Sequence, residues 1–334
     1  MPYIVGTGLT ALDLIVQNGP SGVSYSASGG GTCGNVLAIL ARMGWRSSWF
    51  GSFDESASGH LIRAEMLRSG VFMHTAPAGS TSRVPVFAHH IDVDAHGHAN
   101  HWFSDACPHC GGKLPSYERP SDSWLNSLGR YAREADVFFA DRLSGGVIDL
   151  AERAKHAGAL VVYEPSSPSD APWMSDMMGL ADIVKYSHDR AQALENAMPA
   201  RDSALWIETQ GRNGLRWAHE REGAWQAVPA VDNPETLDSC GAGDWFTSAL
   251  LFLLLDTDRK PYELGANQLN EIMRAASRVA AWSCGFLGAR GALYDASIRC
   301  VYEQLNVTSI PHATPQRLSR PEPFVEIGNV CAFA

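Results

Sequence analysis

The chain of 334 residues lacks any apolar run long enough to cross a membrane. The apolar stretch Ala249 to Leu255 is far shorter than the ~20 residues that a membrane-spanning helix requires. The first residues, Met1 to Val5, also lack the basic stretch and the small-residue cleavage site of a secretory signal peptide. These absences predict a cytoplasmic protein that does not contact a membrane.

An excess of positive charge and a regular cysteine framework are missing as well. The chain has 26 Lys and Arg against 36 Asp and Glu, and the net charge of −10 disfavours a nucleic-acid surface, which needs clustered basic residues. A free nucleotide is still compatible with this charge. The seven cysteines lie at irregular spacings, which is typical of reduced thiols. With 45% hydrophobic residues, the chain can form one large α/β domain or two smaller ones.

One stretch combines small residues with two carboxylates: Asp238-Ser239-Cys240-Gly241-Ala242-Gly243-Asp244, followed directly by the apolar run Trp245 to Leu255. Small residues at the start of a helix leave several backbone N–H groups unpaired, and the helix dipole favours an anion such as phosphate there. Asp244 would lie in the first turn, where a carboxylate can accept a proton from an attacking hydroxyl. The alternative is a Gly-rich turn that only caps a core helix.

This stretch resembles the Asp-Thr-x-Gly-Ala-Gly-Asp signature of the ribokinase-like, or PfkB, family of carbohydrate and nucleoside kinases, which carry it in the last third of the chain. Residues 43–59 resemble the family's first signature. The resemblance implies a ribokinase-like three-layer α/β fold with a central, mostly parallel sheet and a small β-sheet lid. It implies a kinase domain over residues 1–305, with lid elements at about 12–33 and 82–118, and a C-terminal extension over 306–334.

The pattern of elements agrees with such a fold. Residues 136–198 alternate short apolar runs with helical patterns, which indicates parallel strands joined by crossover helices. Strands are predicted there at Asp136–Ala140, Ala159–Tyr163 and Asp182–Lys185, with helices at Gly145–His156 and His188–Met198. Elsewhere, helices are predicted at Ser56–Ser69, Ser121–Glu134 and Asn270–Phe286, and a lid hairpin around the turn Asp94–Gly97. Because the family often dimerises through its lid, we expect a homodimer.

Residues near the N-terminus are candidates for binding the acceptor. The resemblance assigns substrate contacts to Asp13, to the pair Gly30 and Gly31, and to Asn35. The two carboxylate oxygens of Asp13 suit a vicinal diol, glycines let a ligand approach the backbone, and an amide both donates and accepts. The alternatives are an ordinary turn or edge aspartate and a flexible loop before a helix.

Residues in the second half are candidates for binding the nucleotide. Ligands of parallel sheets bind off the carboxyl ends of the strands, where Asp141, Glu164 and Lys185 occur. Residues 209–214 resemble the family's Thr-x-Gly-x-x-Gly nucleotide loop, although a plain turn before a hairpin is the alternative. Residues 284–292 resemble the family's nucleotide-base wall and a loop that can hold a monovalent cation. The resemblance assigns nucleotide contacts to Lys185, Ser187, Thr209, Gly211, Gly214, Asp238 and Gly288.

One position departs from the family pattern. The family's Asn-x-x-Glu motif, which organises Mg²⁺ and phosphate through water, is replaced here by Ser187 and Arg190. The replacement removes two hard oxygen ligands of the kind that Mg²⁺ prefers. It predicts either a subfamily trait or a weaker magnesium arrangement.

A second departure is Cys107-Pro108-His109-Cys110-Gly111-Gly112, which has the CPxCG form of a zinc knuckle. Only half of a tetrahedral site is present in this segment. The missing ligands would come from the lid or from a second subunit, because six of the twelve histidines lie in or near this region: His89, His90, His96, His98, His101 and His109. The alternatives to zinc bound by Cys107 and Cys110 are a free dithiol turn and histidines that merely line a polar lid.

We therefore expect an ATP- and Mg²⁺-dependent kinase that phosphorylates a hydroxymethyl group of a sugar. In this mechanism Asp244 is the general base, and the amides of Gly241, Ala242 and Gly243 form the anion hole. One alternative is a nucleoside kinase of the same fold. The other is a non-catalytic sugar- or nucleotide-binding scaffold, although such a scaffold has no physical need for a carboxylate beside an anion site.

Overall fold

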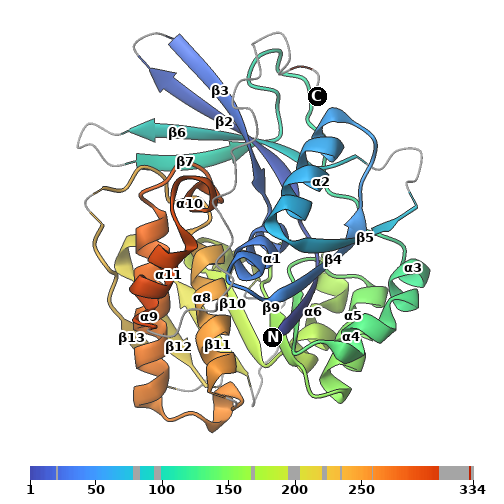
Figure 1. The fold of residues 1–334 in the computed structure, drawn as a ribbon, viewed down its shortest axis with the longest axis vertical. Helices are drawn as coiled ribbons and strands as arrows, with labels where there is room; N and C mark the ends of the chain where they lie inside the picture. Colours follow the sequence, from blue (N-terminus) through green and yellow to red (C-terminus); the bar gives the residue numbers. More distant parts are fainter. Residues whose placement is uncertain are drawn as a thin grey trace.

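A computed structural model of the chain describes residues 1–19, 22–77, 83–93, 99–166, 170–194, 204–219, 224–233, 235–257, 259–307 and 331. Within these ranges the chain forms a large β-sheet through the middle of the molecule and a small one that projects from one end (Figure 1). The predicted turn at residues 94–97 and the predicted extension beyond residue 307, Cys331 excepted, lie outside the described residues. None of the helices in these ranges is long and apolar enough to span a membrane.

The large sheet has nine strands in the order β13-β12-β11-β10-β9-β8-β1-β4-β5. Neighbouring strands are parallel except at one edge, where β12 pairs antiparallel with β11 and β13. Apolar runs buried along their whole length become interior parallel strands because helices cover both faces. The strands are β1 (Tyr3–Thr7), β4 (Arg46–Ser52), β5 (Val71–Ala76), β8 (Val137–Ala140), β9 (Leu160–Tyr163), β10 (Ile183–Ser187), β11 (Leu205–Thr209), β12 (Leu215–Ala218) and β13 (Gln226–Val228).

Two helical layers enclose this sheet. Successive strand residues point to opposite faces, so Ile4 and Phe139 join one hydrophobic cluster while Val5 and Phe138 join the other. Helices of the first layer are α1 (Thr32–Arg42), α2 (Ala57–Ser69), α8 (Ala242–Asp256), α9 (Ala266–Ser283) and α11 (Ile298–Leu305). Helices of the second are α3 (Asp122–Ser127), α4 (Gly129–Glu134), α5 (Gly145–His156) and α6 (Ala171–Leu180). The predicted three-layer α/β architecture with a central, mostly parallel sheet is confirmed.

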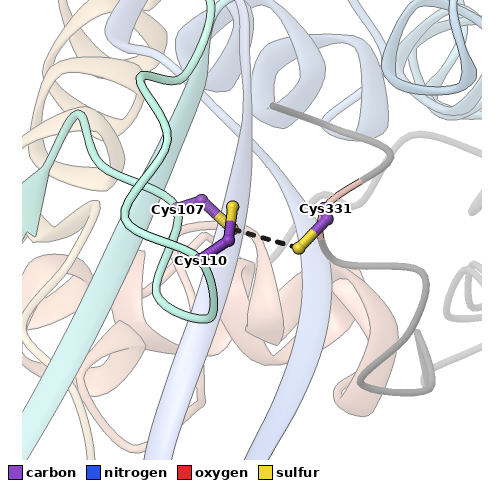
Figure 2. A group of neighbouring side chains, drawn as sticks. All are labelled: Cys107, Cys110 and Cys331. Carbon is purple, nitrogen blue, oxygen red and sulfur yellow. Dashed lines mark hydrogen bonds between the residues drawn. The ribbon is translucent and has the colours of Figure 1, made fainter.

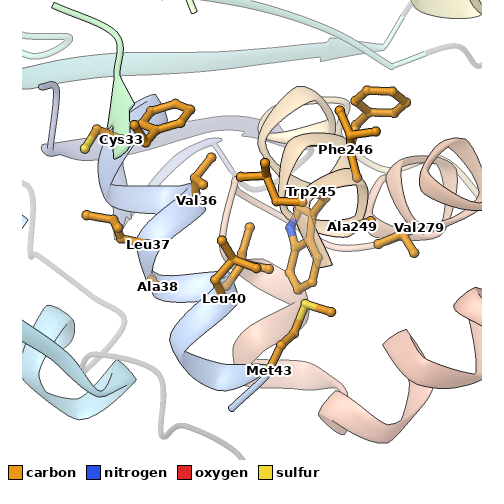
Figure 3. Close-up of a cluster of buried hydrophobic side chains, with 14 of the residues drawn as sticks. Cys33, Val36, Leu37, Ala38, Leu40, Met43, Trp245, Phe246, Ala249 and Val279 are labelled. Atoms are coloured by element: carbon orange, nitrogen blue, oxygen red, sulfur yellow. The ribbon is translucent and has the colours of Figure 1, made fainter. Parts of the chain in front are cut away.

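Helices α1 and α8 pack against each other in the first cluster. Val36 of α1 and Met43, the residue that caps this helix at its C-terminus, lie beside Trp245 and Ala249 of α8 (Figure 3). Trp245 is 1% exposed, and its Nε1 donates a hydrogen bond to the Ala289 carbonyl at 3.0 Å. Burying a side chain of this size stabilises the fold by roughly 1.5–3 kcal/mol, so the packing holds the start of α8 next to α1.

The small sheet has the strand order β3-β2-β6-β7. Its strands are β2 (Ala11–Gly19), β3 (Gly22–Gly30), β6 (Val86–Val93) and β7 (Ala99–Ser104). Asp13 pairs with Phe87 and Ile15 pairs with His89 in parallel register, so these four side chains share one face. Leu14 alternates with them and therefore lies on the other face, where it joins the first hydrophobic cluster. We call the face that bears Asp13 and His89 the inner face.

Two predicted helices differ from the structure in their bounds. The single helix predicted at Ser121–Glu134 is in fact α3 and α4, and the Ser121 side chain makes no cap hydrogen bond. The break between them lies at Leu128, and the following Gly129 packs so closely against α5 that a Cβ there would lie 2.2 Å from Arg153 Nη1. Helix α9 begins four residues before the predicted Asn270, where the Gln268 side chain accepts a hydrogen bond from the Gly265 amide.

Several elements were not predicted from the sequence: β3, β5, α6, α10 (Gly291–Asp295) and α11. The Ser- and Gly-rich end of β3 is typical of a loop, and its strand conformation comes from pairing with β2 along the whole length. Helix α6 has Pro at its start and Gly near its end, and it is held by burial of Met174, Met177 and Met178. Helix α7 (His188–Leu194) occupies the first part of the predicted His188–Met198, and the remainder lies outside the described residues.

Candidate active site

The loop 238–244 turns into the N-terminus of α8. Its N-cap residue Gly241 has a φ of 77°, and a Cβ there would lie 2.6 Å from Ala289 Cα, so only glycine fits. The amides of Ala242 and Asp244 donate to Ser239 O and Gly241 O. Among the hydrogen bonds of the described residues, none is donated by the amide of Gly241 or of Gly243. These two amides, together with the helix dipole, can therefore bind an anion.

Asp244 lies in the first turn of α8 and is 8% exposed. Its Oδ2 accepts a hydrogen bond from Asn35 Nδ2 at 2.6 Å, and Asn35 Oδ1 accepts one from Arg290 Nε at 2.8 Å. A guanidinium group can only donate, so the oxygen of the Asn35 amide must face Arg290 and its nitrogen must face Asp244. Asn35 thereby orients the carboxylate.

Arg290 is completely buried and links this amide to α2. Its Nη1 lies 2.8 Å from Glu65 Oε1, and Glu65 Oε2 accepts a hydrogen bond from the Gly29 amide at 2.9 Å. A Cβ on Gly29 would lie 2.4 Å from Arg290 Nη1, and a Cβ on Gly34 would lie 2.7 Å from Nη2. The glycines before and within α1 are therefore needed to accommodate the guanidinium group, whatever else they bind.

The electrostatic surroundings of Asp244 suit a proton acceptor. Burial, with a further contribution from the Glu164 charge, raises the pKa of Asp244 to about 7, against the opposing influence of Lys185 and Asn35. Lys185 Nζ lies 2.9 Å from Glu164 Oε2 and donates to Gly243 O at 3.0 Å, and Thr247 Oγ1 donates to the other oxygen of Glu164. A carboxylate that titrates near neutral pH can take and return a proton efficiently.

The inner face of the small sheet brings Asp13 and two histidines to the same region. Asp13 is 4% exposed, and burial raises its pKa to about 6, although the charges of His89 and Arg290 oppose the rise. His89 is completely buried, and neither of its ring nitrogens makes a hydrogen bond within the described part of the chain. His101 Nδ1 lies 2.9 Å from Ser239 Oγ, so the sheet contacts the loop 238–244.

The remaining predicted acceptor residues lie beside Asp13. A Cβ on Gly30 would lie 2.1 Å from Asp13 Oδ2, and Gly31 has a φ of 83°. The structure thus brings Asp13, Gly30, Gly31 and Asn35 together near Asp244.

Asp238 sits at the other end of the loop and has a different environment. Its Oδ1 accepts a hydrogen bond from the Cys240 amide at 2.9 Å, and its Oδ2 accepts one from the Gly288 amide at 2.8 Å. Burial acts to raise the pKa of Asp238, but His89, whose Nε2 lies 3.5 Å from Oδ1, and the two amides hold the pKa below its ordinary value. Asp238 and Gly288 are therefore brought together, and their contact joins two loops.

Three predicted nucleotide residues lie at the ends of adjacent strands. Ser187 ends β10 and pairs with Thr209 at the end of β11, whose Oγ1 donates to Tyr186 O at 3.4 Å. Gly211 follows as the first residue of a 3₁₀ turn (Gly211–Asn213) with a φ of 55°. Gly214 has a φ of 88°, and a Cβ there would lie 2.2 Å from Val228 O, so this glycine is required by the turn itself. Arg190 is exposed on α7.

A hollow of about 360 Å³ lies where α9 ends. Its lining includes Asn233 from the loop before residue 238 and Trp282, Gly285 and Phe286 from the end of α9. The Cys284 carbonyl accepts hydrogen bonds from the amides of Leu237 and Asp238, so the rim of the hollow is attached to the loop 238–244. The residues predicted as a nucleotide-base wall thus border a pocket large enough for a planar ring.

Cys107 and Cys110 lie apart from these groups. Cys107 belongs to the hydrophobic cluster that includes Leu14, on the face of the small sheet opposite the inner face. Within the described ranges, the cluster of potential metal ligands that contains both thiols includes no histidine. The expectation that lid histidines complete this site is not met by the residues that the structure describes.

Residues 138–295 match the model of the pfkB family carbohydrate kinases. This stretch of the chain is therefore similar to the pfkB family carbohydrate kinases. Over 271 residues it is 26% identical to a fructokinase from Vibrio alginolyticus, a match that covers 74% of this chain and 82% of the relative. It is 24% identical over 292 residues to a probable fructokinase-4 from Arabidopsis thaliana, covering 79% of this chain and 84% of the relative.

Solved structures show the same fold. An uncharacterized sugar kinase from Pyrococcus horikoshii superposes with a TM-score of 0.67 at 20% identity, covering 91% of this chain and 99% of that one. A fructokinase with bound ATP from Xylella fastidiosa gives a TM-score of 0.64 at 20% identity, covering 91% and 98%. The small sheet and the large sheet of this chain therefore belong to one ribokinase-like fold.

Half of the candidate site lies outside the stretch that matches the pfkB family model. Lys185, Arg290 and the loop 238–244 fall within residues 138–295, whereas Asp13 and Asn35 precede them. The predicted acceptor residues thus come from the part of the chain that the family model does not cover.

Sequence reasoning missed three residues of this candidate site: Glu65, Arg290 and His89. A signal existed for Glu65, because it lies next to Met66 on the apolar face of a predicted helix, and a buried carboxylate needs a cationic or hydrogen-bonding partner. Arg290 lies in a run of small residues, which is an unusual place for a long charged side chain. No pattern in the sequence indicates that Glu65 and Arg290, which are 225 positions apart, contact each other.

Proposed function

We propose that this chain is an ATP-dependent kinase that phosphorylates a hydroxymethyl group of a sugar, with Asp244 as the general base. The pfkB family match and the fructokinase relatives support the reaction class. One observation carries the assignment of roles. A buried carboxylate with a pKa near 7 stands at the same helix N-terminus as two amides that are available to an anion.

In the proposed reaction Asp244 accepts the proton of the sugar hydroxyl. The hydroxyl oxygen then forms a bond to the γ-phosphorus, the bond from that phosphorus to the β–γ bridging oxygen breaks, and ADP leaves. The available amides of Gly241 and Gly243 at the start of α8 would stabilise the charge on the transferred group, while the Ala242 amide, predicted as a third donor, donates to Ser239 O. Asn35 keeps the carboxylate pointed at the acceptor.

Asp13 supports the choice of a sugar as acceptor. This carboxylate is buried next to Gly30, on the inner face of the small sheet, where a ligand with adjacent hydroxyl groups can approach the backbone. Several relatives are named fructokinases, so D-fructose is the first acceptor to test. His89, which is buried on the same face of the small sheet as Asp13, would be a further hydroxyl contact.

The nucleotide would lie on the other side of the loop 238–244. Its base would enter the hollow at the end of α9, and its phosphates would approach Lys185 and the strand-end residues Ser187 and Thr209. Gly211 and Gly214 would shape the turn around it, and the bond between Asp238 and Gly288 would hold the loops. A monovalent cation beside residues 284–292 stays a prediction.

The carboxylates at the carboxyl ends of the parallel strands are suitable ligands for Mg²⁺. Asp141 and Glu164 are buried carboxylates at strand ends, and oxygen ligands are the ones that Mg²⁺ prefers. Because both carboxylates already accept hydrogen bonds from protein groups, they would hold the ion through water. When bound, Mg²⁺ supplies neutralisation of the phosphate charge.

The test is ADP release by the purified chain with ATP and a panel of sugars and nucleosides. We expect turnover with a sugar, fructose first, and a loss of turnover in Asp244→Asn. Turnover with nucleosides alone would change the acceptor class, and undiminished turnover in Asp244→Asn would overturn the mechanism. Omission of Mg²⁺, and exchange of K⁺ for Na⁺, test the two ions in the same assay.

We also propose that the protein is cytoplasmic and forms a homodimer through the small sheet. Trp102 is 49% exposed there, stacked on His90 at 3.8 Å between ring centroids, and Val23 is 46% exposed. Sedimentation equilibrium of the unmodified chain and of Trp102→Ser tests the dimer. A monomer at micromolar concentration in the unmodified chain would contradict it.

A further inference from the structure

Three cysteine side chains from two distant segments meet on the far side of the small sheet from Asp13. The sulfur atoms of Cys107, Cys110 and Cys331 all lie within 4.8 Å of one another (Figure 2). Cys107 and Cys110 come from the turn after β7, and Cys331 comes from the C-terminal end of the chain, 224 residues later. The third thiol is the ligand that the sequence alone did not identify.

The turn that carries the first two thiols is built before any ligand arrives. The Cys107 amide donates to Gly112 O at 2.7 Å, and the Gly111 amide donates back to Cys107 O at 2.9 Å. On either side of this turn, Ala106 and Lys113 form an antiparallel β-bridge, and the Leu114 amide donates a hydrogen bond to Asp105 O. Gly111 has a φ of 73°, which a side chain would disfavour. Two thiolates held by one tight turn are the usual first half of a tetrahedral zinc site.

The spacing of the sulfurs favours a shared metal ion over a disulfide. Four sulfurs at about 2.3 Å from a tetrahedral zinc lie about 3.8 Å from each other, whereas bonded sulfurs lie about 2.05 Å apart. The separation between Cys107 Sγ and Cys331 Sγ is 4.0 Å. A disulfide would also use only two of the three thiols and leave the third without a function. Soft thiolate ligands select zinc over magnesium or calcium.

The burial of the three residues also fits a site that is closed on one side. Cys107 is 2% exposed and lies in the hydrophobic cluster with Leu114, against which Cys331 packs. Cys110 is exposed, so an ion can enter from solvent. The described residues supply three ligand atoms, and the fourth position of the ion would be taken by water or by another ligand.

We propose that Cys107, Cys110 and Cys331 bind one Zn²⁺ ion, which fastens the C-terminal segment to the base of the small sheet. Binding converts the thiols to thiolates and releases their protons, with no change in the oxidation state of sulfur or metal. The ion closes a loop of chain from residue 107 to residue 331, which contains strands β8 to β13 of the large sheet. It is a structural site, on the opposite face of the small sheet from the proposed acceptor site.

The test uses the full chain, purified under reducing conditions, freed of metal with a chelator and titrated with Zn²⁺ against a chromophoric competitor. We expect one zinc per chain. Cys331→Ser and Cys110→Ser should each lower the affinity about 10-fold or more, since each removes one ligand. Cys300→Ser is the matched control, because Cys300 lies on α11 outside the cluster and should bind as the unmodified chain does.

Two further measurements separate a metal site from a folding effect. Titration with Co²⁺ should produce the thiolate-to-metal charge-transfer absorption in the unmodified chain and in Cys300→Ser, and a weaker one in Cys331→Ser. Zinc should raise the melting temperature of the first two proteins and have little effect on the third. Circular dichroism of the metal-free variants verifies that each is folded.

Three results would overturn the proposal. The first is the absence of bound Zn²⁺ and Co²⁺ while all three thiols react as free cysteines. The second is a disulfide between two of the three, found by peptide mass spectrometry without reduction. The third is an unchanged affinity in Cys331→Ser, which would exclude the C-terminal cysteine from the site.

Discussion

The two ends of the loop 238–244 carry the same kind of residue in opposite electrostatic environments. Asp238 accepts two backbone hydrogen bonds and lies near His89, so its pKa is below the ordinary value. Asp244 accepts one side-chain hydrogen bond and is buried near Glu164, so its pKa rises to about 7. Both side chains are largely buried, so burial does not explain the difference between their pKa values. The hydrogen-bond donors and the neighbouring charges explain it.

Under the proposed mechanism, the contrast separates a structural aspartate, Asp238, from a reactive one, Asp244. A carboxylate whose oxygens are saturated by backbone amides holds two loops together and does not exchange a proton near neutral pH. A carboxylate with fewer donors is destabilised as an anion and gains basicity, which is what proton abstraction requires. The predictions below test this division between Asp238 and Asp244.

The largest effect is expected for Asp244→Asn. Removal of the proposed base should lower kcat/KM for the sugar about 10²–10⁴-fold, since proton transfer by a positioned group contributes about that much. The same change should raise the free energy of unfolding at pH 7.5 by roughly 1–3 kcal/mol, because it removes a buried ion. ADP-release kinetics and urea denaturation measure the two effects.

The sign of the stability effect depends on pH. The folded-state pKa of Asp244 is raised, so the folded protein binds the proton more tightly than the unfolded chain between about pH 4 and 7. Its stability therefore falls as the pH rises through this window, and Asp244→Asn should stabilise much less at pH 4 than at pH 7.5. Equal stabilisation at both pH values would contradict the assigned pKa.

A smaller loss of activity is expected for Asn35→Leu. The change removes the amide that links Asp244 to Arg290 while it keeps the approximate shape of the side chain. We expect kcat to fall about 10–100-fold, with the acid limb of the pH profile moved to higher pH, since the hydrogen bond from Asn35 lowers the pKa of Asp244. A change in KM alone, with the limb unmoved, would show that Asn35 only binds the acceptor.

Asp238→Asn should act mainly on stability. An asparagine can accept from one of the two amides of Cys240 and Gly288 but presents a donor to the other, which should cost roughly 1–3 kcal/mol. The folded-state pKa of Asp238 is lowered, so its contribution is present above pH 4 and is lost as the pH falls through the folded pKa. We expect the two proteins to differ in urea at pH 7 and to converge at low pH. Equal stability of Asp238→Asn and the unmodified chain at pH 7 would show that Asp238 does not have the structural role that distinguishes it from Asp244.

The smallest effect is a displacement of the pH profile. For the unmodified chain we expect kcat/KM to rise with pH through about 7, because Asp244 must be ionised to accept the proton. Glu164→Gln should move this limb to lower pH by about half a unit to one, since the Glu164 charge raises the pKa of Asp244. Lys185→Met is the matched opposite change and should move the limb upward. Displacement of both variants in one direction would refute the proposed electrostatics.

The sequence predicted much of the fold and most of the candidate residues. Helix α5 spans the predicted Gly145–His156, and α2 begins after Ser56, whose side chain accepts a hydrogen bond from the Gly59 amide. Periodicity and capping are local signals, so they can be interpreted without the tertiary structure. The break at Leu128 and the helix α6 were missed because neighbouring elements, and not local propensity, decide them.

Interactions between distant parts of the chain could not be predicted from local signals in the sequence. Glu65, Arg290 and Asn35 form one connected path to Asp244, yet no local pattern in the sequence relates them. Cys331 likewise reaches Cys107 from the other end of the chain. Both the buried ion pair of Glu65 with Arg290 and the cluster of thiols depend on packing geometry, which a linear pattern does not encode.

By itself, the sequence determined the order of the elements, the glycine-rich loop that starts α8 and the identity of the carboxylates at its two ends. These follow from spacing, propensity and the steric freedom of glycine, all of which act over a few residues. Only the tertiary structure decided which carboxylate is held by amides and which has a raised pKa. It also decided which thiols meet, because burial and hydrogen bonds arise from segments brought together by the fold.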